Sequence, residues 1–315
     1  MFRLISTATP VAGGGYFGGS GGTNNLITHC TFDGNVAASK DGGGMFMSYS
    51  GWVCSNSFFS NNIAATSGGG MRLRYGAIVK NCVIARNTSQ SQSGNSGGGG
   101  VAMGDAGTLV QNCIIEQNTA GFYGGGIYHS SGAILRNCLI RNNIAMNDAG
   151  TAGYGGAMRV FAKNANILSC TIISNYAYTH GGGIYNDRAA DYTARVDNCI
   201  VYFNKADSTG TATSSNLYDT SSSSSYSNCC VAGWASATAV VITNNNITAN
   251  PQFVDWTNGN YHLDRNSRCI NAGVNRDWMM NAVDFDGYRR VDNFSGVVDI
   301  GCYEYLPSGV VFSGF

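Results

Sequence analysis

The chain repeats one short phrase, Asn-Cys-x-Ile/Val-x-x-Asn, at nearly regular intervals. Clean or slightly altered copies occupy residues 29–35, 81–87, 112–118, 137–143, 169–175 and 198–204. Serine replaces the cysteine at Ser57, and a decayed copy begins at Asn228. Successive thiol positions are 25 to 32 residues apart. Self-similarity at such a period indicates a stacked repeat architecture.

A second phrase, Gly-Gly-Gly followed by an apolar residue, alternates with the first. Its copies end at Gly15, Gly44, Gly70, Gly100, Gly126 and Gly183, with Gly155-Gly156-Ala157 as a variant. The segments between the phrases are short and alternate in polarity, which predicts strands rather than helices. Three short strands and three corners make one coil of a parallel β-helix. Insertions at 91–95 and 147–151 predict longer loops at one corner, because they consist of turn-forming residues.

Stacked coils would bring equivalent side chains into columns about 4.8 Å apart. The asparagine that closes each phrase is then expected to form a ladder of amide hydrogen bonds at a corner. The cysteine column is interpreted as free, buried thiols, because side chains in register point the same way and cannot easily form disulfides. Cys269 and Cys302 lie outside the column and form the one pair for which a disulfide is worth testing.

Composition excludes several functional classes. The formal net charge is zero and charged residues make up 11% of the chain, so a basic nucleic-acid-binding protein is not expected. No run of 18 apolar residues is present, which argues against a membrane-spanning helix. The first residues show no signal peptide. Coil sequence begins by Gly13 without an N-terminal cap, which indicates missing flanking domains of a longer chain or a partner over the first coil.

The repeats resemble those of bacterial right-handed parallel β-helix proteins of the cell surface. Phe32-Asp33-Gly34-Asn35 and Phe59-Ser60-Asn61-Asn62, with the glycine phrases, are similar to the repeats of chlamydial polymorphic outer membrane proteins. The resemblance covers roughly residues 13–204. It implies an all-β, single-stranded, right-handed solenoid of the pectate-lyase-like type, with about seven or eight coils. It also implies an extracellular or cell-surface location.

The C-terminal part carries a second resemblance. Its phrases at 250–255, 270–273, 284–289 and 299–305 look like the closing segment of secreted β-helix proteins, including the choice-of-anchor Q type. The chain departs from that pattern at Asn250, Arg268, Cys269, Asn271 and Cys302. We therefore expect coils over residues 1–243 and a C-terminal cap over 244–315, because an open end of a solenoid must be covered.

A candidate binding face follows from alternation after each glycine phrase. The first position should point inward, at Met45, Met71, Val101, Ile127, Met158 and Ile184. The next should face solvent, at Phe17, Phe46, Arg72, Ala102, Tyr128, Arg159 and Tyr185. The aromatic and arginine members suit a polysaccharide, so Phe46, Arg72, Tyr128, Arg159 and Tyr185 are the predicted ligand-binding residues. Alternatively, these side chains simply stabilise the sheet by stacking on each other.

Catalytic and metal-binding candidates are few. Asp187 and Arg188 are expected near Arg159 and Lys163 of the preceding coil, where they form either a catalytic cluster or a solvated ion-pair patch.

Asp284 and Asp286 could supply oxygen ligands to Ca²⁺, or could instead form Asx turns and pair with Arg289 and Arg290. No cysteine or histidine spacing typical of zinc sites occurs.

Three functions fit the sequence. We expect a non-catalytic extracellular or cell-surface solenoid that binds polysaccharide or a surface glycan, or that mediates adhesion. The alternatives are a polysaccharide lyase or glycoside hydrolase, and a purely structural stalk or passenger. Convergent carboxylates, or a basic residue beside Ca²⁺, would favour the enzyme. Fold alone does not decide among the three.

Overall fold

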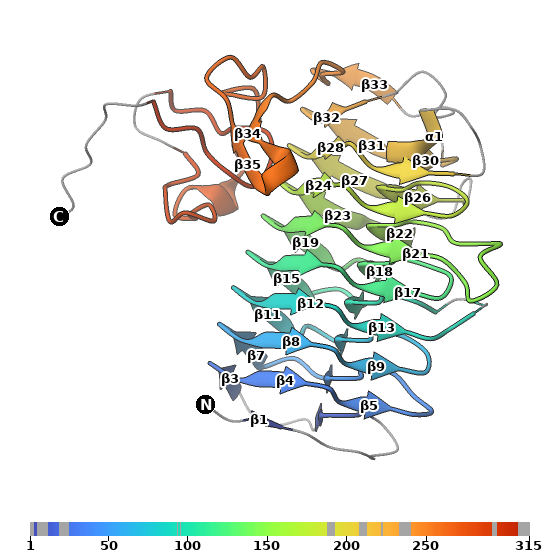
Figure 1. The fold of residues 1–315 in the computed structure, drawn as a ribbon. Helices are drawn as coiled ribbons and strands as arrows, with labels where there is room; N and C mark the ends of the chain where they lie inside the picture. The colour runs from blue at the N-terminus through green and yellow to red at the C-terminus, as the bar shows by residue number, and fades with distance from the viewer. Residues whose placement is uncertain are drawn as a thin grey trace.

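The computed structural model describes residues 3–4, 12–18, 25–92, 94, 96–187, 193–207, 213–221, 223–232, 241–291 and 295–307. The described chain winds through four parallel sheets that run the length of a solenoid (Figure 1). We name these sheets A to D. Each coil passes through sheets C, A, D and B in that order, as in β3 (Asn25–Thr28), β4 (Thr31–Asp33), β5 (Val36–Ala37) and β6 (Met45–Met47). The predicted right-handed parallel β-helix is confirmed.

Sheets A and C form two long faces. Sheet A contains β1 (Arg3–Leu4), β4 (Thr31–Asp33), β8 (Phe58–Ser60), β12 (Val83–Ala85), β16 (Ile114–Glu116), β20 (Leu139–Arg141), β24 (Thr171–Ile173), β28 (Ile200–Tyr202) and β32 (Cys230–Val231). Sheet C contains β3 (Asn25–Thr28), β7 (Trp52–Ser55), β11 (Ile78–Lys80), β15 (Leu109–Gln111), β19 (Ile134–Arg136), β23 (Ala165–Leu168), β27 (Ala194–Asp197), β31 (Ser225–Ser227) and β33 (Val241–Asn244).

Sheets B and D close each coil. Sheet B contains β2 (Gly15–Phe17), β6 (Met45–Met47), β10 (Met71–Leu73), β14 (Val101–Met103), β18 (Ile127–Ser130), β22 (Met158–Phe161), β26 (Ile184–Asn186) and β30 (Leu217–Asp219). The short sheet D contains β5 (Val36–Ala37), β9 (Ile63–Ala64), β13 (Thr88–Ser89), β17 (Thr119–Ala120), β21 (Ile144–Ala145), β25 (Tyr176–Ala177) and β29 (Lys205–Ala206). A single-turn helix, α1 (Thr213–Asn216), precedes β30.

The corner between sheets A and D carries the predicted asparagine ladder. The backbone N–H and the side-chain Nδ2 of Asn118 both donate to Oδ1 of Asn143, at 3.0 Å. Asn143 repeats both bonds to Asn175, at 2.9 Å. The ladder runs on to Asn216 in α1, which lies outside the repeated phrase. Each rung satisfies buried backbone and amide groups, so the corner needs no water.

The glycine phrase is required by two different constraints. Gly124 has φ of +64°, a left-handed conformation that favours glycine. A Cβ on the next glycine, Gly125, would collide with the carbonyl oxygen of Gly156 in the following coil. The phrase therefore marks a corner where the backbones of successive coils pack against each other.

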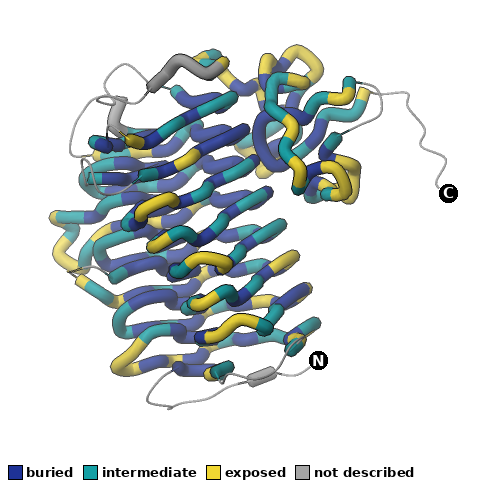
Figure 2. The backbone as a smooth tube through the Cα atoms, turned by 180° about the vertical axis from the view of Figure 1, so that it is seen from behind, coloured by how far each residue is buried: buried dark blue, intermediate teal, exposed yellow. Residues whose placement is uncertain are grey.

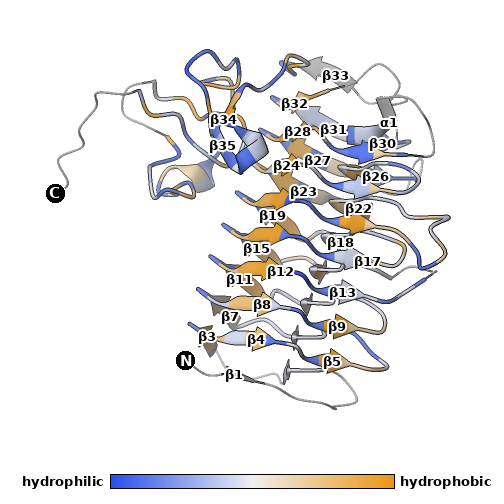
Figure 3. Ribbon diagram, in the orientation of Figure 1, coloured by the Kyte–Doolittle hydropathy of each residue, from blue (hydrophilic) through white to orange (hydrophobic). Residues whose placement is uncertain are grey.

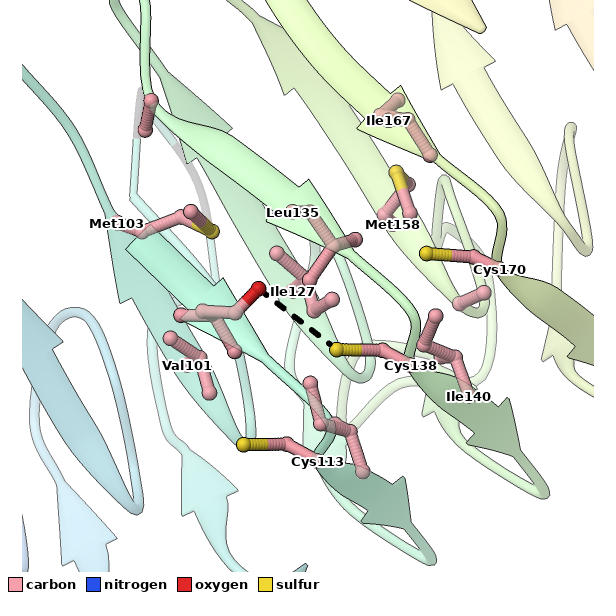
Figure 4. Close-up of a cluster of buried hydrophobic side chains, with 14 of the residues drawn as sticks. Val101, Met103, Cys113, Ile127, Leu135, Cys138, Ile140, Met158, Ile167 and Cys170 are labelled. Atoms are coloured by element: carbon pink, nitrogen blue, oxygen red, sulfur yellow. Dashed lines mark hydrogen bonds between the residues drawn. The ribbon is translucent and has the colours of Figure 1, made fainter. Parts of the chain in front are cut away.

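The solenoid interior is apolar, and the six residues predicted to point inward after the glycine phrases are fully buried. Buried residues follow the inside of the coils, and exposed residues gather at corners and on the C-terminal segment (Figure 2). Strands of the central coils are the most apolar (Figure 3). Cys113, Cys138 and Cys170 lie one above another beside Ile127 (Figure 4). All eleven cysteines are free, as predicted for the column, and Cys269 and Cys302 form no disulfide.

The C-terminal segment lies where the sequence predicted a cap, and the division of the chain at residue 243 stays a prediction. It contains the antiparallel pair β34 (Phe253–Asp255) and β35 (Asn260–Leu263) and the 3-10 turns η2 (Trp256–Asn258) and η3 (Asp277–Met279). Ile247 pairs with Cys230 at the end of sheet A, and residues from Phe253 onward pack against the outer face of that sheet (Figure 1). The reason is that outward positions of sheet A in the upper coils are apolar, at Leu139, Ile173 and Ile200.

Polar contacts fix this segment to the coils. Asn198 Nδ2 donates to the carbonyl oxygen of Val274 at 2.8 Å, and the N–H of Gly301 donates to the carbonyl oxygen of Asn198 at 2.8 Å. Asn137 Nδ2 donates to the carbonyl oxygen of Val283 at 3.2 Å.

No helix in the described part of the chain is long and apolar enough to cross a membrane.

Candidate functional site

The predicted row on the outer face of sheet B is continuous in register. Strand pairing aligns Tyr16, Phe46, Arg72, Ala102, Tyr128, Arg159, Tyr185 and Tyr218. The first member is Tyr16 and not the predicted Phe17, because Gly15 pairs with Met45 and shifts the alignment by one residue. Phe17 instead packs against the interior cluster.

Exposure of this row differs from the prediction. Phe46 and Arg72 are half-buried, whereas Ala102, Tyr128, Arg159 and Tyr185 are buried. A second layer accounts for this burial. Residues at the end of the loops from sheet D, Tyr123, Tyr154 and His180, pair as isolated parallel bridges and lie beside the row.

The sequence contained a signal for this second layer. Tyr123, Tyr154 and His180 each stand directly before a glycine phrase. The repeat alone therefore predicts that these three residues form a column. We call Tyr123, Tyr154, His180, Tyr185 and Tyr218, with Arg159, the aromatic cluster.

Rings of the aromatic cluster contact one another continuously across the coils of β18 to β30. Centroids of Tyr123 and Tyr154 are 5.5 Å apart, and those of Tyr154 and Tyr185 are 4.9 Å apart. Tyr218 stacks on His180 at 4.5 Å and on Tyr185 at 5.3 Å. These spacings are typical of favourable aromatic pairs. Tyr123, Tyr154, His180 and Tyr218 retain partial exposure, so they present the cluster to solvent.

Arg159 lies beneath this surface and is 1% exposed. Its guanidinium carbon is 3.5 Å from the ring centroid of Tyr123, and Nη2 donates to Oδ1 of Asp187 at 3.2 Å. Its Nε and Nη1 atoms have no hydrogen-bond partner among the described residues. A cation held under aromatic faces and paired to one carboxylate gives the cluster a fixed electrostatic pattern.

The predicted catalytic group is assembled only in part. Arg159 and Asp187 meet as expected from their successive coils. Lys163 is exposed and forms no ion pair in the part of the chain that the structure describes. Arg188 lies outside the described residues.

Most side chains of the cluster are neutral. Burial raises the pKa of the Tyr185 phenol, and partial burial lowers the pKa of His180. Both groups are therefore uncharged near neutral pH. The charges left in the cluster are those of Arg159 and Asp187, which compensate each other.

The lower part of the row is a separate patch. Nε of Arg72 is 3.7 Å from Oδ2 of Asp41, and the rings of Tyr16 and Phe46 meet edge-to-face at 5.5 Å. Ala102 separates this patch from Tyr128, because it places a small side chain between them.

Asp284 takes the Asx-turn arrangement that the sequence offered as one alternative, whereas Asp286 does not. Oδ1 of Asp284 accepts the N–H groups of Asp286 and Tyr288, and Oδ2 accepts that of Glu304, each at 2.9 Å. Asp286 lies 2.6 Å from Nε2 of His262. Arg290 pairs with Glu304 at 3.1 Å rather than with either aspartate, and Arg289 is exposed. A calcium role for the two aspartates stays a prediction.

Over the described ranges, no three His, Cys, Asp or Glu side chains come close enough together to hold a metal ion.

Comparison with known proteins defines the architecture. No protein-family model and no curated protein matches the chain. The chain is similar to the crystal structure of pectate lyase Pel9A, with a TM-score of 0.51 over 92% of this chain and 85% of that chain. Sequence identity is 15%, so the similarity shows the fold alone. The protein is an all-β parallel solenoid with a pectate-lyase-like fold. The relation to polymorphic outer membrane protein and choice-of-anchor Q sequences stays a prediction.

Proposed function

We propose that this protein is a non-catalytic, extracellular or cell-surface solenoid that binds polysaccharide through the aromatic cluster. The observation that carries the proposal is the continuous row of ring contacts from Tyr123 through Tyr154 and His180 to Tyr218 along the coils. Aromatic faces stack on the apolar faces of sugar rings, and phenol and imidazole groups bond to hydroxyls. A stack that follows the solenoid axis suits an extended glycan chain.

An enzyme is the second candidate, a polysaccharide lyase or a glycoside hydrolase. The pairing of Arg159 with Asp187 favours it, because a basic group beside a carboxylate can take part in proton transfer. Two features support binding over catalysis. Arg159 is almost fully buried, and Asp187 is the one carboxylate paired with it in the described chain, whereas hydrolases need two carboxylates.

The test combines a glycan array with an assay for cleavage. The double variant Tyr154→Ala/Tyr218→Ala should bind the best array glycan about tenfold more weakly, since it removes two stacking faces. Tyr49→Ala, which removes an exposed tyrosine outside the cluster, is the matched control and should bind like the wild type.

Ultraviolet detection of unsaturated products and of new reducing ends separates the two candidates. Turnover of the bound glycan that disappears in Asp187→Asn would replace the binding proposal by the enzyme. Equal retention of glycans by the double variant and the wild type would reject the aromatic cluster as the binding face.

A further inference from the structure

A hollow of about 380 Å³ opens between sheet A and the C-terminal segment, on a different face from the aromatic cluster. The C-terminal segment stops covering sheet A at this point. Its turn from Val283 to Gly287 lies over the coils of β12 and β16. A volume of this size accommodates a small-molecule group such as one or two sugar rings.

The floor of the hollow is apolar and continues beyond it. Val83 and Ile114 point outward from β12 and β16 and are register partners. Phe58 is the partner of Val83 in the preceding coil, and its ring is 55% exposed. The floor therefore runs from the hollow onto an exposed aromatic face, along the direction of the solenoid axis.

One side of the hollow is a row of primary amides. Asn56, Asn81 and Asn112 occupy equivalent corner positions in three successive coils, with φ of +48°, +54° and +51°. Asn112 Oδ1 accepts a bond from Nδ2 of Asn137 at 2.9 Å, which orients the Asn112 amide. Asn56 and Asn81 are exposed, so their amides can both donate to and accept from a ligand's hydroxyl groups.

The opposite wall carries an aromatic ring and no free charge. Phe285 lines the hollow and packs on Tyr303, with centroids 5.6 Å apart. Cys82 and Asp284 are the ionisable groups among the lining residues. The Cys82 thiol donates to the carbonyl oxygen of Lys80, and both Asp284 oxygens accept backbone N–H groups. An anionic ligand would meet the Asp284 carboxylate without a compensating cation.

We propose that this hollow is a binding site for a neutral sugar unit of a glycan chain. The sugar unit lies over Val83 and Ile114 and bonds to the Asn81 and Asn112 amides, and the rest of the chain extends toward Phe58. The inference goes beyond the proposed function, because it assigns a second site on sheet A that shares no residue with the aromatic cluster. It also commits to an uncharged sugar, since the lining offers amides and rings but no cation.

The experiment is calorimetric titration of the whole chain with neutral tetrasaccharides (xylotetraose, cellotetraose and mannotetraose) and with the acidic tetragalacturonate. At least one neutral tetrasaccharide should bind and tetragalacturonate should not. Asn81→Gly keeps the left-handed corner and removes one amide, so affinity should fall about fivefold to tenfold. Val83→Trp fills the hollow from its floor and should abolish binding.

Asn142→Gly is the matched control, because Asn142 is exposed and has φ of +55° at a different corner. It should bind like the wild type. Circular dichroism confirms folding of each variant, and Asn81→Gly keeps the test valid if Val83→Trp does not fold.

Four results would overturn the site. They are no binding of any neutral tetrasaccharide, unchanged binding by both hollow variants, loss of binding in the aromatic double variant alone, and equal affinity for tetragalacturonate. The third result would leave the proposed function standing while removing the hollow.

Discussion

The guanidinium of Arg159 lies 3.5 Å from the ring centroid of Tyr123, although the two residues belong to different coils. Arg159 projects from β22, and Tyr123 ends the loop that precedes β18. The contact holds a positive charge under an aromatic face, with Asp187 as its counter-ion. The cluster is therefore a packed assembly with an exposed surface, and its buried and exposed tyrosines should respond differently to substitution.

Buried tyrosines of the row should control stability. Tyr128→Ala and Tyr185→Ala remove side chains that are 3% and 5% exposed, so each should lower the free energy of unfolding by about 3 kcal/mol. Tyr154→Ala and Tyr218→Ala, at half-buried positions, should cost clearly less. Urea unfolding followed by circular dichroism measures both sets. Equal losses in the two sets would contradict the two-layer arrangement.

Ile127 tests the interior assignment. Ile127→Asp buries an unpaired carboxylate in the core and should cost more than about 4 kcal/mol, with loss of the neighbouring coils. Ile144→Asp is the matched control, because Ile144 points outward from sheet D and is 37% exposed. Hydrogen exchange locates the coils that open. A native exchange pattern in Ile127→Asp would be incompatible with its burial.

Each rung of the asparagine ladder should contribute strongly to the free energy of unfolding. Asn118→Ala removes the side-chain bonds to Asn143 and to the carbonyl oxygen of Ile84, and it takes away the acceptor of the buried Asn87 N–H. We expect a loss of about 3 kcal/mol. Asn166→Ala breaks a single bond near the surface and should cost less than about 1 kcal/mol. Thermal unfolding compares the two, and similar melting temperatures would refute the ladder's role.

His129 should make stability depend on pH. Burial lowers its pKa from 6.5 to about 4, so the folded state holds it neutral while the unfolded chain takes up a proton. Neutral His129 therefore contributes to the free energy of unfolding above pH 6.5. This contribution is lost as the pH falls toward 4, by about 3 kcal/mol in total.

His129→Met should remove this part of the pH dependence, because the side chain lies between Met103 and Val160 in register. His29→Asn, at an exposed corner with φ of +53°, should leave the dependence unchanged. Unfolding free energies measured between pH 4 and pH 7 supply the comparison. Parallel curves for His129→Met and the wild type would exclude His129 as the source.

Buried thiols should be protected from reagents. Ten of the eleven cysteines are buried and Cys30 is half-buried, so at most about one thiol should react with a water-soluble disulfide reagent in the native protein. Burial also raises the pKa of Cys113 and suppresses its thiolate. Unfolding in guanidinium chloride should release all eleven, and Cys30→Ser should abolish the native signal. Rapid reaction of several native thiols would show that the column is accessible.

Periodicity explains which parts of the structure the sequence could predict. Asn118 and Asn143 recur at the same place in their phrases, so their contact follows once coils stack in register. The pairing of Arg159 with Asp187 was predictable for the same reason, because the two lie near equivalent positions in successive coils. The misplacement of Phe17 arose where the first glycine phrase is offset by one residue from the next.

Contacts outside the repeat could not be predicted from it. The C-terminal segment packs on Leu139 and Ile200, and nothing in its own sequence specifies that side of the solenoid. The apolar character of those outward positions was the missing evidence. Burial of Tyr185 depends in the same way on His180 and Tyr154, whose loops vary in length between coils. The hollow beside Asn81 exists only where the C-terminal turn meets the coils.

Because the C-terminal segment packs on the side of the solenoid, the two ends of the solenoid should resist mechanical force differently. Coils near β4 and β8 are held by their immediate neighbours, whereas coils from β20 to β32 are also clamped by the segment. Tension applied at the β4 side therefore peels rungs away singly. Unfolding from the opposite end must also break contacts such as the hydrogen bond between Asn198 and Val274. The coils from β20 to β32 should therefore unfold together.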